Sequence, residues 1–153
     1  MDASLKNALA QPAPLLFGAI KIELPGYTLR LLDGSAVLQI GSEIYAGLDA
    51  TFGTLGGISD LSEEIGDNAP EVTVTLMPPD VSATAVLSHP NMQGSVATIM
   101  VGAVDAATGA VIGTPEILFL GEIDVPTIGI DESGARTVEF TIVSVFERLF
   151  ETE

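Results

Sequence analysis

The chain has no cysteine, no tryptophan and a single histidine among its 153 residues. Without cysteine it has no disulfide, no thiolate nucleophile and no Cys-based metal site. His89 precedes a proline in a turn-like stretch, and no second histidine exists to share a metal or to build a catalytic triad around. We therefore interpret His89 as a surface turn residue.

Motifs for nucleotide binding and acyl transfer are also absent. The sequence contains no Gly-x-Ser-x-Gly elbow, no Gly-x-x-x-x-Gly-Lys phosphate loop and no Gly-x-Gly-x-x-Gly fingerprint. The number of carboxylates allows a two-acid glycosidase, but two Tyr, six Phe and no Trp offer little surface for stacking on sugars. We predict that the chain is not an enzyme and that it uses no cofactor.

Basic residues are scarce, with 5 Lys and Arg against 21 Asp and Glu, which gives a net charge of −16. Such a surface repels phosphate, so we expect neither nucleic-acid binding nor attraction to an anionic membrane. Two interpretations of the charge remain open. It keeps an apolar chain soluble, or it forms a surface or channel wall along which DNA passes without adhering.

Long apolar runs that would cross a membrane are not present either. Residues 81–104 carry no charge, but Pro90 and many Ser, Thr, Asn and Gln residues interrupt them. The chain opens with Met1 and Asp2 and has no basic segment before an apolar run, so we expect no secretory signal.

What the sequence does contain predicts an all-β fold. Hydrophobic residues make up 47% of the chain, and 16 glycines punctuate it at intervals typical of an antiparallel barrel or sandwich. Strands Leu15–Leu24 and Tyr27–Leu32 alternate apolar and polar residues on either side of Pro25-Gly26, which favours a type II turn. We predict a single β-domain at residues 15–153, preceded at 1–14 by a short helix and a proline-rich joint.

The remaining elements are predicted from alternation and turn residues. Residues 49–57 are expected to be a loop or an irregular strand, and Gly121 is expected to mark a bulge or kink. A first helix begins at a Ser4 cap, and a last helix at 146–151 is expected to plug one end of the barrel. Further strands are predicted at 36–40, 43–46, 58–65, 71–77, 95–104, 110–113, 116–120, 122–130 and 135–145, and a short helix at 81–87.

An acidic segment precedes the well-defined strand Glu71–Met77. It contains Asp60, Glu63, Glu64 and Asp67 with no cation among them. These four residues are our candidates for an inter-subunit interface or a channel-lining surface. Calcium binding there, or at Asp131-Glu132, is an alternative, but neither stretch has the spaced Asp/Asn pattern of an EF-hand loop. We therefore predict solvated acidic loops and no metal site.

Several segments together resemble the β-domain of tail-tip proteins from long-tailed bacteriophages and gene transfer agents, the baseplate hub or distal-tail group. The likeness covers most of residues 15–150. The segments are Leu31-Leu-Asp-Gly34 followed by Ile44-Tyr45, the acidic stretch 59–66, Pro70-Glu-Val-Thr-Val-Thr75, Gly121-Glu-Ile123 and Phe146-Glu-Arg-Leu149.

The resemblance implies a structural protein of the virion tail, made in the bacterial host cytoplasm, with no catalytic residue in this domain. It implies a ring that joins the tail tube to tip proteins and lines or borders the DNA channel, with DNA only as passing cargo. Its partners would be copies of itself and other tail proteins. A stand-alone β-sandwich that binds carbohydrate or mediates calcium-dependent adhesion is the alternative, and a hydrolase comes third.

Overall fold

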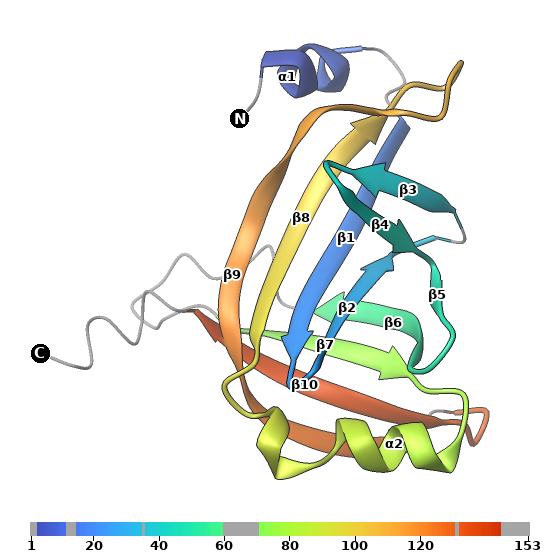
Figure 1. Cartoon of the computed structure of the whole chain (residues 1–153), viewed down its shortest axis with the longest axis vertical. Helices are drawn as coiled ribbons and strands as arrows, with labels where there is room; N and C mark the ends of the chain where they lie inside the picture. Colours follow the sequence, from blue (N-terminus) through green and yellow to red (C-terminus); the bar gives the residue numbers. More distant parts are fainter. Residues whose placement is uncertain (1–2, 12–14, 35, 60–70, 131, 145–153) are drawn as a thin grey trace, which may run out of the picture.

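A computed structural model describes residues 3–11, 15–34, 36–59, 71–130 and 132–144. Ten strands form one sheet in the order β3-β4-β2-β1-β8-β9-β10-β7-β6-β5. Figure 1 shows that the sheet is strongly curled, with a short helix at each end. The predicted all-β fold with few helices is confirmed. The sheet is mixed, because β2 and β4 pair in parallel at Leu31 and Ala46.

The first hairpin forms with the predicted bounds. Strands β1 (Leu15–Leu24) and β2 (Tyr27–Leu32) pair antiparallel, with Leu24 opposite Tyr27. Gly26 has φ 76°, the left-handed value that the third position of a type II turn requires. Alternation along both strands turns their branched apolar side chains to the inside of the curled sheet, where Ile22 is fully buried.

Strand β8 (Val96–Val104) lies between β1 and β9, as expected for a central strand. Strand β9 (Val111–Ile130) differs from expectation, because one continuous strand replaces three predicted pieces. Its first half pairs with β8 and its second half with β10 (Arg136–Ser144). The prolines and glycines that suggested breaks lie mostly where β9 has a neighbour on one side only, and proline is tolerated at such an edge.

Gly121 lies where β9 changes partner and has β8 on one side and β10 on the other. A Cβ at this position would lie 2.4 Å from the carbonyl oxygen of Val143, so the close approach requires glycine. The bulge predicted here is displaced, because the register irregularity between β9 and β10 falls between Phe140 and Ile142.

The other half of the sheet contains β7 (Glu71–Met77), β6 (Gly53–Ser59) and the two-residue β5 (Leu48–Asp49). Of the two alternatives expected at 49–57, a loop or an irregular strand, the structure shows mostly the irregular strand, with a register shift between Leu55 and Gly57. Gly53, with φ 87°, brings the chain so close to Met77 that an added Cβ would clash with its carbonyl oxygen. That contact lets a glycine-rich segment pair with β7. Only residues 58 and 59 of the strand predicted at 58–65 are described, as the end of β6.

Strands β3 (Val37–Ile40) and β4 (Glu43–Ala46) form a second hairpin across a turn at Gly41, which has φ 63°. One face of this hairpin packs on the outside of β1, β2 and β8. The contact forms a small apolar cluster of Phe17, Ala19, Leu32, Leu38, Tyr45 and Met100.

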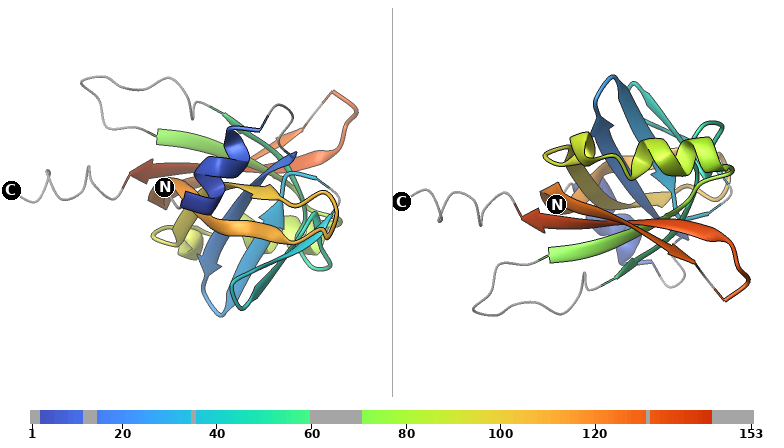
Figure 2. Two further views of the ribbon diagram at one scale, coloured as in Figure 1. Left: turned by 90° about the horizontal axis from the view of Figure 1, so that it is seen from above. Right: turned by 90° about the horizontal axis from the view of Figure 1, so that it is seen from below.

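The helices lie at opposite ends of the curled sheet, as the views from above and below show (Figure 2). Helix α1 (Ala3–Leu9) contacts β8 and β9 and buries Leu5. The prediction that Ser4 caps this helix is wrong, because the helix begins at Ala3 and Ser4 lies inside its first turn. Helix α2 (Val81–Leu87) has the predicted bounds and is followed by a 3-10 turn at Pro90–Met92. The helix predicted at 146–151 lies outside the described residues.

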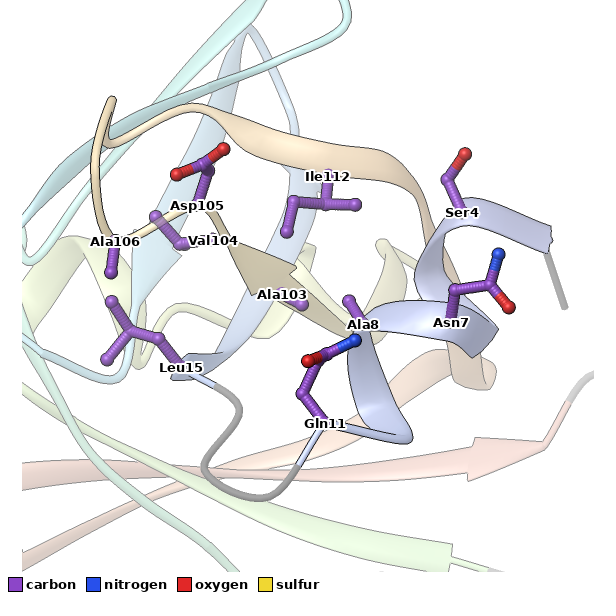
Figure 3. A pocket seen from close by; sticks show the side chains of 10 residues that line it. All are labelled: Ser4, Asn7, Ala8, Gln11, Leu15, Ala103, Val104, Asp105, Ala106 and Ile112. Carbon is purple, nitrogen blue, oxygen red and sulfur yellow. The ribbon is translucent and has the colours of Figure 1, made fainter.

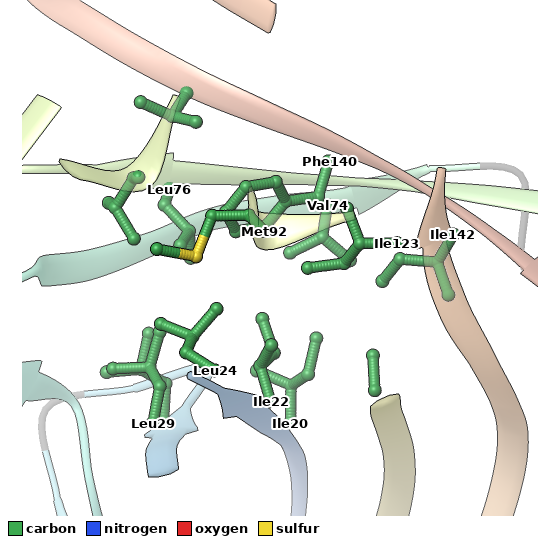
Figure 4. Close-up of a cluster of buried hydrophobic side chains, with 14 of the residues drawn as sticks. Ile20, Ile22, Leu24, Leu29, Val74, Leu76, Met92, Ile123, Phe140 and Ile142 are labelled. Atoms are coloured by element: carbon green, nitrogen blue, oxygen red, sulfur yellow. The ribbon is translucent and has the colours of Figure 1, made fainter. Parts of the chain in front are cut away.

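The main core fills the inside of the curl. Figure 4 shows side chains of β1 and β2, such as Ile20 and Leu29, facing side chains of β7 and β10, such as Val74 and Phe140. Each fully buried side chain of this kind stabilises the fold by about 1.5–3 kcal/mol. Among the residues described, no helix has the length and apolarity needed to cross a membrane.

Candidate functional site

The four acidic residues predicted as an interface or channel surface, Asp60, Glu63, Glu64 and Asp67, lie outside the described residues. Their flanking strands β6 and β7 pair antiparallel, with Ser59 opposite Thr73. The described residues on either side of the acidic segment therefore lie on neighbouring strands. Asp131 is also outside the description, and Glu132 beside it is exposed.

The structure agrees with the interpretation of His89 as a turn residue. His89 is exposed, and its Nδ1 accepts a hydrogen bond from the Asn91 backbone N–H at 3.1 Å. It thereby caps the 3-10 turn at Pro90–Met92. Within the described part of the chain, no three His, Asp or Glu side chains cluster closely enough to hold a metal ion.

One hollow of about 680 Å³ lies between α1 and the adjoining ends of β8 and β9 (Figure 3). Its one acidic side chain, Asp105, already accepts a hydrogen bond from the Ala107 backbone N–H at 2.8 Å and so stabilises its own turn. The remaining polar groups are amides and a hydroxyl with no base beside them. The lining residues are Ser4, Asn7, Ala8, Gln11, Leu15, Ala103, Val104, Asp105, Ala106 and Ile112.

A second hollow of similar volume lies beside the start of α2 and is lined by Pro78, Asp80 and Arg136 among others. Asp80 is the N-cap of α2, and its carboxylate accepts a hydrogen bond from the Ala83 backbone N–H at 2.8 Å. In both hollows the carboxylate accepts a hydrogen bond from a backbone N–H close in the sequence and so stabilises the local turn or helix start. Neither brings together a nucleophile and a base from the described residues.

A charged trio lies where β1, β2 and β4 meet. Lys21 Nζ and Arg30 Nη2 lie 2.9 Å and 2.8 Å from the same carboxylate oxygen of Glu43. The Lys21 hydrogen bond is the main reason that the pKa of Glu43 lies below its usual value, and the Arg30 hydrogen bond adds to the effect. Two of the chain's five cations are thereby committed to a single carboxylate.

A second polar contact joins β2 to the end strand β5 across the curled sheet. The Tyr27 hydroxyl of β2 donates to Asp49 Oδ2 of β5 at 2.5 Å. The other carboxylate oxygen of Asp49 accepts the backbone N–H groups of Thr51 and Phe52. The Tyr27 and Phe52 rings lie edge to face with centroids 5.3 Å apart. Hydrogen bonding to Asp49 is the main cause of the raised pKa of Tyr27.

The outward face of the β3–β4 hairpin is apolar and exposed. Val37, at 65% exposure, and Ile44, at 55%, point away from the cluster that the hairpin covers, and Leu48 in the adjoining β5 is 64% exposed. We call Val37 and Ile44 the hairpin surface, and Gln39, paired opposite Ile44, is a polar residue on the same face. Glu43 is the only charged residue between 36 and 48, and it belongs to the trio with Lys21 and Arg30.

Sequence reasoning placed both hairpin strands but missed this surface. The signal was available, because Val37 and Leu38 on one strand and Ile44 and Tyr45 on the other give the hairpin two apolar faces. One face of the hairpin covers the small apolar cluster, so apolar side chains on the opposite face are not needed for packing within the chain. Such a face is typical of an interaction surface.

No family model matches the chain, and no curated protein matches its sequence.

Proposed function

We propose that the chain is a non-enzymatic structural component of a bacteriophage or phage-like tail tip. In this proposal it is a hub or distal-tail ring protein that joins the tail tube to tip proteins. It contacts copies of itself and neighbouring tail proteins, and it borders a channel through which DNA passes without being bound.

The observation that carries this proposal is the hairpin surface on an otherwise acidic molecule. Large aliphatic side chains that are more than half exposed gain stability when a partner removes them from water, at about 25 cal/mol per Å² of apolar area. The described hollows offer no competing site, since their carboxylates serve as turn and cap acceptors. Docking to other proteins therefore accounts for the surface better than catalysis does.

The net charge of the chain supports the proposal that it borders a channel through which DNA passes without being bound. With 21 acidic and 5 basic residues, the chain repels the phosphate backbone at every distance within the Debye length. Two of the five cations, Lys21 and Arg30, are neutralised in part by Glu43. A protein of this kind beside a DNA channel would lower adhesion of the passing duplex.

Purified tailed particles from the source of this chain provide the test. Quantitative mass spectrometry should find the chain in the particle in a small fixed copy number, and gold-labelled antibody should mark the tail tip. Deletion of its gene should yield particles with defective tails, and an intact copy should restore them. Absence of the chain from particles, together with calcium-dependent melting or glycan binding by the isolated chain, would instead support an adhesion module.

A further inference from the structure

We propose that residues 145–150 of this chain dock against the first half of its own strand β9, over Ile117 and Leu118. Residues 145–153 lie outside the described residues, so the inference rests on the described strands that lead to this segment and that it would cover. It goes beyond the tail-tip proposal and does not depend on it, because it concerns contacts within one chain.

Strand β9 changes its partner halfway along, and this leaves one side of its first half without a neighbouring strand. Residues 121–130 lie beside β10, whereas residues 117–120 lie beside β8 and next to no other described strand. Figure 1 shows β9 bending away from β10 and running on beside β8. Because an uncovered strand side is a template for pairing with other chains, folded proteins usually cover it.

The uncovered stretch carries two large apolar side chains in contact with water. Ile117 is 58% exposed and Leu118 is 47% exposed, although the next residue, Phe119, is buried in the main core. Removing both side chains from water would be favourable. This stretch of β9 is therefore a docking site that lacks a described occupant.

The direction of β10 leads the chain to this site. β10 runs antiparallel to β9, and its last residue, Ser144, lies opposite Gly121. Antiparallel pairing means that the chain beyond Ser144 heads toward the residues of β9 that precede Gly121. These residues are the uncovered ones.

The length of the segment suffices for the contact. Leu118 lies three residues from Gly121, which is about 10 Å along a strand. The five residues from Ser144 to Leu149 span at most about 18 Å when extended. The exposed Ile130, at the other end of β9, lies nine residues from Gly121, or about 30 Å along the strand. The segment therefore reaches Leu118 and not Ile130.

The composition of the segment fits an apolar site. Val145, Phe146, Leu149 and Phe150 are four of the six residues at 145–150. The last three share one face of the helix predicted at 146–151, and this face would pack on β9 instead of plugging the end of the barrel. Attachment to β10 gives the segment an effective concentration on the order of millimolar at the site. That advantage over any separate partner selects it as the occupant.

Engineered cysteines test the contact in the full chain, which has no cysteine of its own. Leu118→Cys combined with Leu149→Cys should form an intrachain disulfide under mild oxidation, because docking brings the two Cα atoms within about 7 Å. Ile130→Cys combined with Leu149→Cys is the matched control and should form its disulfide at least about tenfold more slowly. Circular dichroism checks folding, and Ile117→Cys with Phe150→Cys is the second pair if the first variant is unfolded.

Mass spectrometry of unreduced peptides, at several protein concentrations, separates disulfides within a chain from those between chains. A fast intrachain disulfide, formed at a rate independent of protein concentration, supports the inference. Equal rates for the test and control pairs, or disulfides that form only between chains, would overturn it. None of these results decides the tail-tip proposal, since that proposal is tested on purified particles.

Discussion

The hydroxyl of Tyr27 and the carboxylate of Asp49 join strands that stand far apart in the sheet order. β2 is third from one end and β5 is last at the other, yet the two oxygens are 2.5 Å apart. The sheet therefore curls far enough to bring the end strand β5 into side-chain contact with β2. Contacts of β2 with β5 and β6 accompany this hydrogen bond.

Removing the Tyr27 hydroxyl should weaken this contact. Tyr27→Phe keeps the ring beside Phe52 and loses only the hydrogen bond to Asp49, so we expect a loss of about 1 kcal/mol and a fall in Tm of about 2–4 °C. Tyr27→Ala should cost more, because the ring contact is lost as well. Thermal unfolding followed by circular dichroism measures both. A Tyr27→Phe chain as stable as the wild type would show that the hydrogen bond does not stabilise the contact between β2 and β5.

The hydrogen bond between Tyr27 and Asp49 also predicts that the stability of the fold depends on pH in the alkaline range. The pKa of Tyr27 is higher in the folded chain, so the protonated hydroxyl stabilises the fold at pH values below the ordinary tyrosine pKa of about 10. That contribution is lost as the pH rises through the folded pKa. The stability difference between wild type and Tyr27→Phe should therefore shrink above about pH 10. Urea denaturation between neutral and alkaline pH tests this, and a constant difference would contradict it.

Glu43 should respond at the acid end. Hydrogen bonds from Lys21 and then Arg30 lower the pKa of Glu43 in the folded chain. The ionised carboxylate therefore stabilises the fold above the ordinary glutamate pKa of about 4.3, and this stabilisation is lost as the pH falls through the folded pKa. Glu43→Gln should lower stability at pH 7 by less than about 1 kcal/mol, because the three side chains are partly exposed.

Urea denaturation of Glu43→Gln and wild type at pH 7 and pH 3 measures this effect. The difference between the two should be smaller at pH 3 than at pH 7, because the contribution of the wild-type carboxylate is lost as the pH falls through its folded pKa. Glu71→Gln, at an exposed position, is the matched control and should change stability little. Equal effects of both substitutions would show that the trio adds no specific stability.

Gly121 should not tolerate a side chain. Alanine there would place its Cβ 2.4 Å from the Val143 carbonyl oxygen and 2.8 Å from Ile142 Cγ2, so we expect a loss of about 1–3 kcal/mol from overpacking. Gly57→Ala in β6 is the control, since no described atom lies within 4 Å of its built Cβ. Chemical denaturation of both variants tests the prediction. Equal stability of the two would mean that β8, β9 and β10 separate easily at this crossing.

The sequence predicts a strand or helix well where the interactions that determine it lie within a few residues. The β1–β2 hairpin and α2 were placed correctly because Pro25-Gly26 and the Asp80 cap act within a few residues. β9 was divided into pieces because its glycines and prolines signal local breaks, whereas pairing first with β8 and then with β10 maintains the strand. β6 was predicted only as one of two alternatives, a loop or an irregular strand, because its glycines suit both until β7 lies beside them.

The candidate site was predicted less well for the same reason. Alternation shows that Val37 and Leu38 point to opposite faces, but both are apolar, and only the packing of β3 on β1 and β8 decides which one is buried. The acidic residues 60–67 stay a prediction from the sequence, because they lie outside the described residues.

Charge reversal tests that acidic segment directly. The double substitution Glu63→Lys and Glu64→Lys should disturb tail assembly or DNA delivery while the isolated chain stays folded, because the proposed role is in contact or channel lining. Infectious titre and tail morphology measure the first effect, and circular dichroism the second. Glu132→Lys, at an exposed turn, is the control. Normal tails and normal delivery with the double variant would remove these residues from the proposed surface.

Cryo-electron microscopy of native tails tests the central claim most directly. The account predicts a symmetric ring at the tail tip in which each subunit fits the ten-stranded curled sheet, with Val37 and Ile44 buried against a neighbouring protein. Density for this chain outside the tail, or a tail tip built without it, would contradict the account.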